Sequence, residues 1–490
     1  MTQQILVAGA GIAGLNAAMA LASPERHVVV LDRDPPPPDT SPEEAFYDWE
    51  RKGATQLRHS HVFLGRLVKL IRAKHPRLWT ELLAAGAREF TFADGLSPHL
   101  KPKYKYQPGD EDMSMLFSRR TTLELIMRRY AQSLPGVTFV PNAGIRGLTL
   151  ERRDNQLVVT GLRVEVEGRE QVMSADIVVD ATGRTTQFPD WLAAEGVTMP
   201  EAPSSAGILY FSRHYRLRDG MDEPPRDGTP AGGDLDYIKY GLFPADNRHF
   251  SVTLACPELE NELRTAIVRP EVFEAACAMM PGAARWTDPA RCEPVSKVFA
   301  MGNLKNSWRD LMPGGKPAAL NFFPIGDAAI RTNPLYGRGC SSGAIQAHIL
   351  ADVLSEVSDP AERMREHAKR VETEIRPFFD MMAKQDAQAI KRAENQLKPG
   401  YKPRLKARLA KSFLEDAIGP ATRDDVRVLR AVMRPFHMLE HPTAWTKRAS
   451  IMGRILRYWA MPKIFKKALY MPALGPKRPE GMKRLGLNAA

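Results

Sequence analysis

The sequence predicts an α/β fold: a parallel-sheet domain assembled from separated segments, an inserted antiparallel-sheet domain and a helical C-terminal region. Three observations predict this arrangement. An apolar run, a glycine turn and an apolar helix follow one another over residues 5–22. Segments of alternating polarity occupy the middle of the chain. Helical spacing of apolar residues dominates after residue 361.

The first segment fits the pattern G-x-G-x-x-G, with glycines at 9, 11 and 14. Gly9 permits the tight turn, Gly11 leaves room for a pyrophosphate against the backbone, and Gly14 lets the helix pack on the strand. The helix begins with Ile12 and Ala13, and it directs free N–H groups and the positive end of its dipole toward the phosphates. We therefore expect all five residues to contact a dinucleotide.

A second apolar run, 28–31, ends at Asp32, followed by Arg33. Asp32 lies 23 residues past Gly9, close to the spacing of about 20 expected for a carboxylate that binds a ribose hydroxyl. Strand, turn, helix and acid together predict a site for an adenine dinucleotide, with Asp32 and Arg33 at its ribose end. The motif alone does not separate FAD from NAD.

At 490 residues the chain is long enough for two or three domains. The motif begins within ten residues of Met1, so we expect no signal peptide. The sequence has no CxxC pair and no cysteine–histidine spacing typical of a metal site, which predicts a reduced, cytoplasmic protein without a bound metal. The four scattered cysteines are Cys256, Cys277, Cys292 and Cys340.

The formal net charge is +12, and much of it lies near the C-terminus. Residues 447–484 contain eleven Lys and Arg against the single acid Glu480, interleaved with Trp, Tyr, Phe and Met. Two interpretations stay open: a helical tail packed on its own protein with a solvated basic face, and a peripheral element on the inner, anionic face of a membrane. No nucleic-acid-binding module accompanies this charge, so we expect no nucleic-acid partner.

Further along the chain, periodicity predicts elements in a consistent order. We expect helices at 62–74, 118–132 and 341–356, a loop with a strand at 91–106, and strands at 137–140, 147–151, 157–166, 175–183, 206–216, 237–242, 249–255 and 320–327, with another ending at Met301. The predicted domains are a nucleotide domain over 1–190 and 318–358, an inserted sheet domain over 191–317 and a helical, basic region over 359–490.

Three later motifs carry a resemblance to a known family. They are Arg120–Glu124, Ala175–Thr186 and Pro324–Ala347. In this order, with the N-terminal glycines, they resemble the flavoprotein monooxygenase superfamily of the para-hydroxybenzoate hydroxylase fold over roughly residues 1–360. Residues 51–61 are similar to the R-x-G-x-x-Q-x-x-H-x-H loop of a bacterial subgroup that includes polyether epoxidases and is related to squalene epoxidases.

The resemblance implies a Rossmann-type FAD-binding domain and further cofactor contacts. Asp327 is expected on the ribityl chain, Arg120 on the pyrophosphate–ribityl region, and the helix that starts near Gly339 is expected to direct its dipole at the flavin ring. The remaining expected cofactor residues are Gln56, His61, Asp180, Ala181, Thr182, Gly183, Gly326, Pro334, Gly337 and Cys340.

The resemblance also implies a reaction. Reduced FAD would react with O₂ to give a C4a-hydroperoxide, which transfers one oxygen to an alkene or electron-rich ring of a hydrophobic polyene, terpenoid or polyketide. His59 and Arg338 are the candidate catalytic residues, although His59 and His61 have the alternative role of packing the loop. Four aromatic residues of the inserted sheet are candidates for the substrate pocket, or else ordinary core residues: Tyr210, Phe211, Tyr240 and Phe243.

The middle motif departs from the hydroxylases. They have G-A-D-G, whose Asp helps hold FAD and NADPH, whereas this chain has Thr182 at that position and Asp180 two positions earlier. Electrons from NAD(P)H therefore arrive either directly or through a separate flavin reductase. D-A-T-G also resembles reductases and cyclases of prenyl and carotenoid double bonds, which gives an alternative function as an FAD-dependent reductase, isomerase or cyclase. The W-x-W-x-I-P signature of halogenases is absent.

Overall fold

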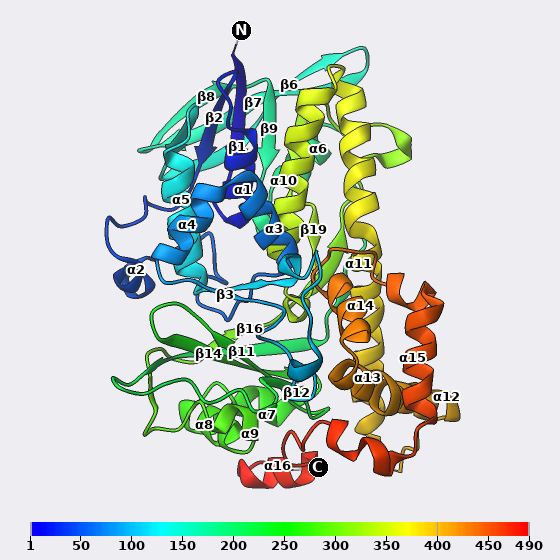
Figure 1. Cartoon of the computed structure of the whole chain (residues 1–490). Coiled ribbons are helices and arrows are strands. Elements are labelled where there is room, and N and C mark those ends of the chain that lie inside the picture. The colour runs from blue at the N-terminus through cyan, green and yellow to red at the C-terminus, as the bar shows by residue number, and fades with distance from the viewer. Residues whose placement is uncertain (1, 399, 489–490) are drawn as a thin grey trace.

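A five-stranded parallel sheet, named the first sheet, forms the centre of one half of the molecule (Figure 1). The computed structural model describes residues 2–398 and 400–488. The strand order is β18-β9-β1-β2-β5, and all neighbours are parallel. The strands are β1 (Gln3–Ala8), β2 (Arg26–Leu31), β5 (Val137–Val140), β9 (Ile177–Asp180) and β18 (Phe322–Pro324). They come from early, middle and late segments, which confirms the predicted discontinuous sheet.

The two faces of the first sheet are covered differently, because successive side chains of a strand point to opposite faces. Ile5 and Val7 of β1 pack against helices, whereas Leu6 and Ala8 pack against an antiparallel meander. The helices are α1 (Ile12–Leu21), α3 (Gly65–Lys74), α4 (Pro76–Ala84), α5 (Arg120–Gln132) and α10 (Gly339–Glu356). The other face carries β6 (Ala143–Arg153), β7 (Gln156–Val166), β8 (Arg169–Ser174) and α6 (Phe188–Ala194).

An antiparallel sheet, named the second sheet, forms the other half of the molecule (Figure 1). Its order is β12-β13-β14-β11-β15, and β16 also pairs with β11. The strands are β11 (Ile208–Leu217), β12 (Gly232–Asp234), β13 (Lys239–Pro244), β14 (His249–Pro257), β15 (Cys292–Pro294) and β16 (Phe299–Met301). One face packs against α7 (Asn261–Ala266), α8 (Pro270–Ala278) and α9 (Pro281–Ala284). The inserted antiparallel sheet is therefore confirmed.

The C-terminal region is helical, as predicted. The long helix α11 (Pro360–Gln396) runs beside both sheets (Figure 1). It is followed by α12 (Leu405–Ser412), η7 (Phe413–Ile418), α13 (Gly419–Asp424), α14 (Val426–Phe436), α15 (Ala449–Ala460), η9 (Lys463–Leu469) and α16 (Arg478–Arg484). In the described part of the chain, no helix combines the length and apolarity that crossing a membrane requires.

Some predicted boundaries differ from the structure. The helix expected from Val62 begins at Gly65, and α10 begins two residues earlier than expected. The strand expected within 91–106 is wrong: β3 (Arg88–Phe90) lies before it and pairs with β4 (Met115–Phe117). The chain instead turns at Thr91, whose N–H and hydroxyl donate to Asp94 at 2.8 and 2.7 Å, which favours a local turn over a strand.

The remaining elements are short. They are α2 (Pro42–Asp48), β10 (Ser204–Ser205), β17 (Lys305–Trp308) and β19 (Ile330–Arg331), and the single turns η1 (Lys101–Lys103), η2 (Glu111–Met113), η3 (Gly183–Thr185), η4 (Pro313–Gly315), η5 (Gly326–Ala328), η6 (Pro334–Tyr336) and η8 (Ala444–Lys447).

A buried ion pair joins the two halves. Asp246, in the turn between β13 and β14, accepts hydrogen bonds from the Arg119 backbone N–H (2.6 Å), Nε (3.0 Å) and Nη2 (2.6 Å), and from the Thr122 hydroxyl (2.8 Å). Burial raises the pKa of Asp246, but Arg119 outweighs it and holds the pKa below its ordinary value. Because α5 begins at Arg120, this pair fixes the start of α5 against the second sheet.

Removing this carboxylate should destabilise the protein strongly. We expect Asp246→Ala to lower the free energy of unfolding by about 3 kcal/mol, because Arg119 stays buried and keeps only the partly exposed Glu43, 2.8 Å away, as a counter-ion. Urea denaturation followed by circular dichroism measures this. Glu165→Ala, which breaks an exposed pair with Arg146, is the matched control and should change stability by less than about 1 kcal/mol. Equal losses of unfolding free energy in the two variants would contradict the role of the Asp246–Arg119 pair in joining the two halves.

Candidate functional site

The glycine turn leaves an open space at the start of α1. A Cβ on Gly9 would lie 2.6 Å from the Ala181 carbonyl oxygen, and one on Gly14 would lie 1.8 Å from the Gly9 carbonyl oxygen. A Cβ on Gly11 meets no described atom within 4 Å. Gly11 is the N-cap of α1 and provides no side-chain cap. The turn therefore fits a phosphate group, since it has free space beside a helix N-terminus.

The N-terminus of α10 lies beside that of α1. A Cβ on Gly326 would lie 2.7 Å from the Cβ of Ala13, and one on Gly343 would lie 3.2 Å from the same atom. Small residues at these positions let α1, η5 and α10 approach closely. The sheet thus brings Asp327 and the loop 333–339 to the edge where the glycine turn opens. Two helix N-termini meet at this edge.

Arg51 is buried at the same edge and binds three carboxylates. Its Nη2 lies 2.9 Å from Asp32 Oδ2, its Nε 3.3 Å from Asp34 Oδ2 and its Nη1 2.8 Å from Glu124 Oε2. Nη1 also donates to the Ala10 carbonyl at 3.0 Å. Sequence reasoning did not assign Arg51 a role, although its position at the head of the R-x-G-x-x-Q-x-x-H-x-H loop was a usable signal. Arg51 connects that loop to β2, α5 and the glycine turn.

Asp32, the expected ribose-binding acid, is buried at the end of β2. Burial raises its pKa, against the opposing effects of Arg51 and of Arg128, whose Nη1 lies 3.4 Å away. Both cations contact Oδ2, while Oδ1 accepts only a long bond of 3.3 Å from the Asp34 N–H. Oδ1 therefore keeps capacity for a hydroxyl donor. Arg33 is exposed and donates to the Lys52 carbonyl at 2.8 Å.

His61 and Arg120 form a second buried pair. His61 Nδ1 lies 2.8 Å from the His59 carbonyl, and Nε2 lies 3.0 Å from Arg120 Nη1. Arg120 must be the donor, so Nδ1 of His61 carries the proton. Burial lowers the pKa of His61 well below its ordinary value, and the ring is neutral. Arg120 Nε also donates to Glu124 at 2.6 Å. Burial raises the pKa of Asp327, and the nearby charge of Arg120 opposes this.

His59 docks the loop on the second sheet. Its Nδ1 lies 3.2 Å from the Ser212 hydroxyl, which contacts Thr253 at 2.8 Å, and Thr253 donates to the Ser60 hydroxyl at 2.7 Å. Burial lowers the pKa of His59 to about 4. The ring is therefore neutral at pH 7 and accepts or donates hydrogen bonds without charge. Gln56 is half-buried in the same loop, where its Oε1 lies 3.5 Å from the Thr55 hydroxyl.

Asp180 organises its own turn. Its carboxylate accepts from the Thr182 N–H at 2.9 Å, the Thr182 hydroxyl at 2.6 Å and the Thr186 hydroxyl at 2.6 Å. Asp180 is buried, which raises its pKa. These bonds place the Ala181 backbone against Gly9 and leave Gly183 at φ 78° facing open space. The geometry gives Asp180 a positioning role, whereas Thr182 and Gly183 lie nearer the surface.

Arg338 is a buried cation without a counter-ion in the described part of the chain, and its guanidinium lies 5.3 Å from the Phe378 ring centre and 5.9 Å from the Tyr336 ring centre. It is 6% exposed, and its Nε and Nη1 have no hydrogen-bond partner among the residues that the structure describes. Burial lowers its pKa to about 10, so it is charged at neutral pH. It is the N-cap of α10, and the Ser341 hydroxyl in the first turn of α10 also lacks a partner within the described ranges. This set of donors fits a ligand group that accepts hydrogen bonds or carries negative charge.

The loop that carries Arg338 is held from outside the nucleotide domain. Asn333 donates to Asp386 of α11 at 2.9 Å, and the Tyr336 hydroxyl donates to the same carboxylate at 2.8 Å. The Tyr210 hydroxyl donates to Asn333 Oδ1 at 2.6 Å. Gly337 takes φ 65°, and no described atom lies within 4 Å of a Cβ on Gly339. Asp386 was missed, because nothing in the sequence around it marks a site.

Two other predicted residues belong to this loop. Pro334 opens the single turn η6, which ends at Tyr336. Cys340 is half-buried, and burial raises the pKa of its thiol to about 11. Cys340 is therefore protonated at neutral pH and is available for packing rather than as an anion.

The four aromatic candidates for the substrate pocket separate onto two faces of the second sheet. Tyr210 and Phe243 share the face of Ser212 and point toward the half of the molecule that contains the first sheet. Phe211 and Tyr240 lie on the opposite face, in the core formed with α8 and α9. Phe211 and Tyr240 therefore occupy the core position that the sequence left open as their alternative, because side chains alternate along a strand.

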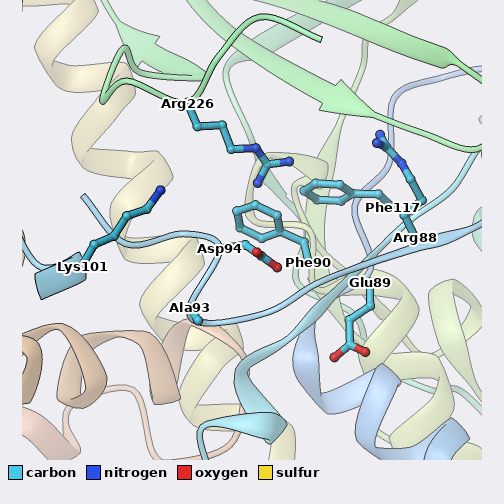
Figure 2. Close-up of a pocket in the computed structure, with 8 residues that line it drawn as sticks. All are labelled: Arg88, Glu89, Phe90, Ala93, Asp94, Lys101, Phe117 and Arg226. Atoms are coloured by element: carbon cyan, nitrogen blue, oxygen red, sulfur yellow. The ribbon is translucent and has the colours of Figure 1, made fainter. Parts of the chain in front are cut away.

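A separate hollow of about 330 Å³ lies between the β3–β4 hairpin and the chain around Arg226 (Figure 2). The Phe90 and Phe117 rings stack at 4.9 Å, and the Arg226 guanidinium lies 4.5 Å from the Phe90 ring centre. None of the predicted site residues lines this hollow. It is therefore distinct from the edge where α1 and α10 meet.

Comparison with known proteins agrees with this geometry. Residues 4–208 match a family model described as an FAD binding domain. Protein Rv3254 of Mycobacterium tuberculosis (strain ATCC 25618 / H37Rv) is 27% identical over 363 residues, which span 70% of this chain and 71% of that protein.

Solved structures share the fold. The flavin-dependent brominase Bmp2 has a TM-score of 0.59 and 15% identity, over 94% of this chain and 99% of that one. PqsL from Pseudomonas aeruginosa, a probable FAD-dependent monooxygenase, has a TM-score of 0.55 and 15% identity, over 80% of this chain and 98% of that one. The flavin-dependent halogenase CmlS has a TM-score of 0.58 and 16% identity, over 94% of this chain and 77% of that one. At these identities the likeness shows the fold alone. The FAD binding domain and this fold together support an FAD-dependent oxidoreductase.

Two glycine variants should separate cofactor binding from folding. Gly11→Val should keep the fold, because the new side chain enters open space, but it should lose FAD because it fills the phosphate site. Gly14→Ala should destabilise the fold itself, because its Cβ would overlap the Gly9 carbonyl. Visible flavin absorbance of the purified proteins and their thermal unfolding measure the two effects. Retention of FAD by Gly11→Val would place the pyrophosphate elsewhere.

Stability should fall as the pH falls below about 6.5. Eight buried histidines have a pKa lowered from 6.5, so the unfolded chain binds more protons than the folded one between pH 6.5 and about 4. They are His59, His61, His75, His214, His249, His348, His367 and His437. Urea denaturation at a series of pH values measures the slope. His214→Gln should reduce it, and a flat profile over that range would contradict the neutral, buried histidines.

Proposed function

We propose that the protein is an FAD-dependent monooxygenase that epoxidises or hydroxylates a hydrophobic small molecule such as a polyene, terpenoid or polyketide. The observation that carries the proposal is the meeting of two helix N-termini, with the buried Arg338 guanidinium at the second, which has no acidic partner among the described residues. This arrangement suits a ligand with a diphosphate at one end and a group that becomes negative at the other. The match of residues 4–208 to an FAD binding domain supports it.

The residues present fit FAD along this edge. The α1 N-terminus beside Gly11 would hold the pyrophosphate, and Asp32 Oδ1 would accept from a ribose hydroxyl. Arg120 and Asp327 would contact the ribityl region, and the α10 N-terminus with Arg338 would face the flavin ring. When bound, FAD supplies the electron storage and the activation of O₂ that side chains lack.

The chain's own residues would stabilise charge, hold the loop in position and exclude water from the site. Arg338 would stabilise negative charge at the ring end, since a preorganised cation in a dry site needs no reorganisation. Asp386 would hold the 333–337 loop in place through Asn333 and Tyr336. The contacts of Arg58 and His59 with His214 and Ser212 would seal the loop against the second sheet and exclude water.

The buried histidines do not supply the acid that a cyclase or isomerase form of the alternative function needs. A cyclase or isomerase that acts by protonating a double bond needs a strong proton donor. His59, His61 and His214 have pKa values lowered by burial and are neutral at pH 7. Bmp2 and CmlS are named as a brominase and a halogenase, but the W-x-W-x-I-P signature is absent here, so we propose oxygenation. The proposal that the protein resembles the polyether-epoxidase subgroup depends on the sequence of the loop 51–61.

Isotope labelling tests this function. The FAD-loaded protein is supplied with NADPH, a flavin reductase, ¹⁸O₂ and a panel of hydrophobic alkenes. One labelled atom should appear in the product and the other in water, with two electrons from NADPH. Omitting the reductase tests whether NADPH is used directly. Product without label, or equal turnover without O₂, would contradict a monooxygenase and favour the reductase or isomerase alternative.

Arg338→Met serves as the active-site variant in the same assay. It should retain FAD but form product about 10²-fold more slowly, as for the loss of one oxyanion donor. Arg376→Met, which removes a partly exposed cation of α11, is the matched control and should leave the rate unchanged. A normal rate for Arg338→Met would remove Arg338 from the proposed site.

A further inference from the structure

The structure divides the basic C-terminal stretch into parts with different environments. Lys466 is buried, and its Nζ donates to the carbonyls of Asp416 and Tyr458 at 2.6 Å each. Arg478 binds Glu260 at 2.8 Å, and Met482 of α16 is buried in the core of the second sheet. These residues stabilise the protein's own fold. The last part of the stretch, which includes α16, is thus packed against the second sheet (Figure 1).

A different surface remains, formed by α12, η7, the end of α15 and η9; we name it the α12–η9 surface. Its apolar side chains are unusually exposed: Ile464 and Phe465 are each 77% exposed, and Leu405 is 68% exposed. The other exposed apolar members are Leu409, Leu414, Leu456 and Trp459. Half of this surface lies outside the stretch 447–484 that composition alone identified.

The elements of the α12–η9 surface are joined to one another. Trp459 Nε1 donates to the Ser412 hydroxyl at 3.1 Å, and the rings of Phe413 and Trp459 meet at 5.3 Å. The Tyr470 hydroxyl, just after η9, donates to Asp416 of η7 at 2.8 Å. Figure 1 shows α12 and α15 at the same end of the molecule. The exposed apolar groups therefore sit on one connected support.

The helix α12 lacks a partner for its apolar side chains. None of its eight residues is buried against the described part of the chain. Leu405 and Leu409 are four residues apart and so lie on one face. α12 continues without a break into η7 and α13, which are packed through Ala417 and Ala421, so its leucines form the uncovered end of a supported helix. Most helices are stabilised by packing an apolar face. A second surface that covers these leucines would provide that packing.

The charge of the surface indicates what covers it. Residues 397–418 contain six Lys and Arg against two acids, Glu415 and Asp416, and Asp416 forms an ion pair with Lys463 at 3.2 Å. Arg457, Lys463 and Lys467 add cations around Ile464 and Phe465. A second copy of this chain is disfavoured, because a twofold interface would place like cations opposite each other. Long cationic side chains flanking exposed Trp, Phe, Ile and Leu are typical of contact with an anionic lipid surface.

We propose that the α12–η9 surface docks the protein peripherally on an anionic phospholipid bilayer. Leu405, Leu409, Ile464 and Phe465 enter the interface, and the surrounding Lys and Arg contact the lipid phosphates. The docking does not depend on the proposed oxygenase activity. It replaces the view of the whole C-terminal stretch as a single basic element.

Vesicle sedimentation of the full-length, FAD-loaded protein tests this proposal. The wild type should bind vesicles of phosphatidylcholine mixed with phosphatidylglycerol, bind phosphatidylcholine alone much more weakly, and be released by salt. The double variant Ile464→Ser/Phe465→Ser should bind at least about tenfold more weakly. Lys406→Ala/Arg408→Ala should weaken binding by about fivefold for each removed cation.

Val172→Ser is the matched control, because Val172 is a similarly exposed apolar residue on β8. It should bind vesicles like the wild type, and flavin absorbance and circular dichroism should be unchanged in all variants. Equal binding to both vesicle types, no binding, or variants that bind like the wild type would overturn the proposal. A dimer that Ile464→Ser/Phe465→Ser dissociates, without vesicle binding by the wild type, would assign the surface to a second copy instead.

Discussion

The guanidinium of Arg51 holds together the elements around the open edge of the first sheet. It contacts Asp32 and Asp34 after β2, Glu124 on α5 and the Ala10 carbonyl in the glycine turn. Arg128 and Arg120 complete the set, so three cations balance three buried acids. Removing one partner from such a network leaves a buried charge uncompensated, which is strongly unfavourable. This charge balance fixes the positions of Asp32, Arg120 and the loop 51–61.

The same loop connects the cofactor edge to the second sheet. His61 accepts from Arg120 on one side, while His59 meets Ser212 on the other. Because burial keeps both imidazoles neutral, the loop adds no charge between the two halves. The positive charge at this edge comes instead from the α10 N-terminus and from Arg338, whose guanidinium lies 5.3 Å from the Phe378 ring centre. Under the proposed function, this charge would face the flavin ring in dry surroundings.

Local rules predicted much of this arrangement. Gly9 and Gly14 are required by close backbone approach, whereas Gly11 leaves open space at the helix N-terminus, and both features are visible in a short stretch of sequence. Alternation identified the long strands β11, β13 and β14 of the second sheet but not which face meets the first sheet, so the sequence left the roles of Phe211 and Tyr240 open between pocket and core. Asp386 lies more than fifty residues from Asn333, and only tertiary packing joins them. For the same reason composition did not show which C-terminal cations pack inward: burial of Lys466 depends on the distant Asp416.

We infer that one extended FAD molecule lies along the edge where α1 and α10 begin, and a crystal structure of the protein with bound FAD is the decisive measurement. We expect the pyrophosphate against the N–H groups after Gly11, a ribose hydroxyl on Asp32 Oδ1, and the isoalloxazine along the 334–339 loop with Arg338 beside it. FAD bound in the hollow near Phe90, or a flavin ring remote from Arg338, would refute this placement.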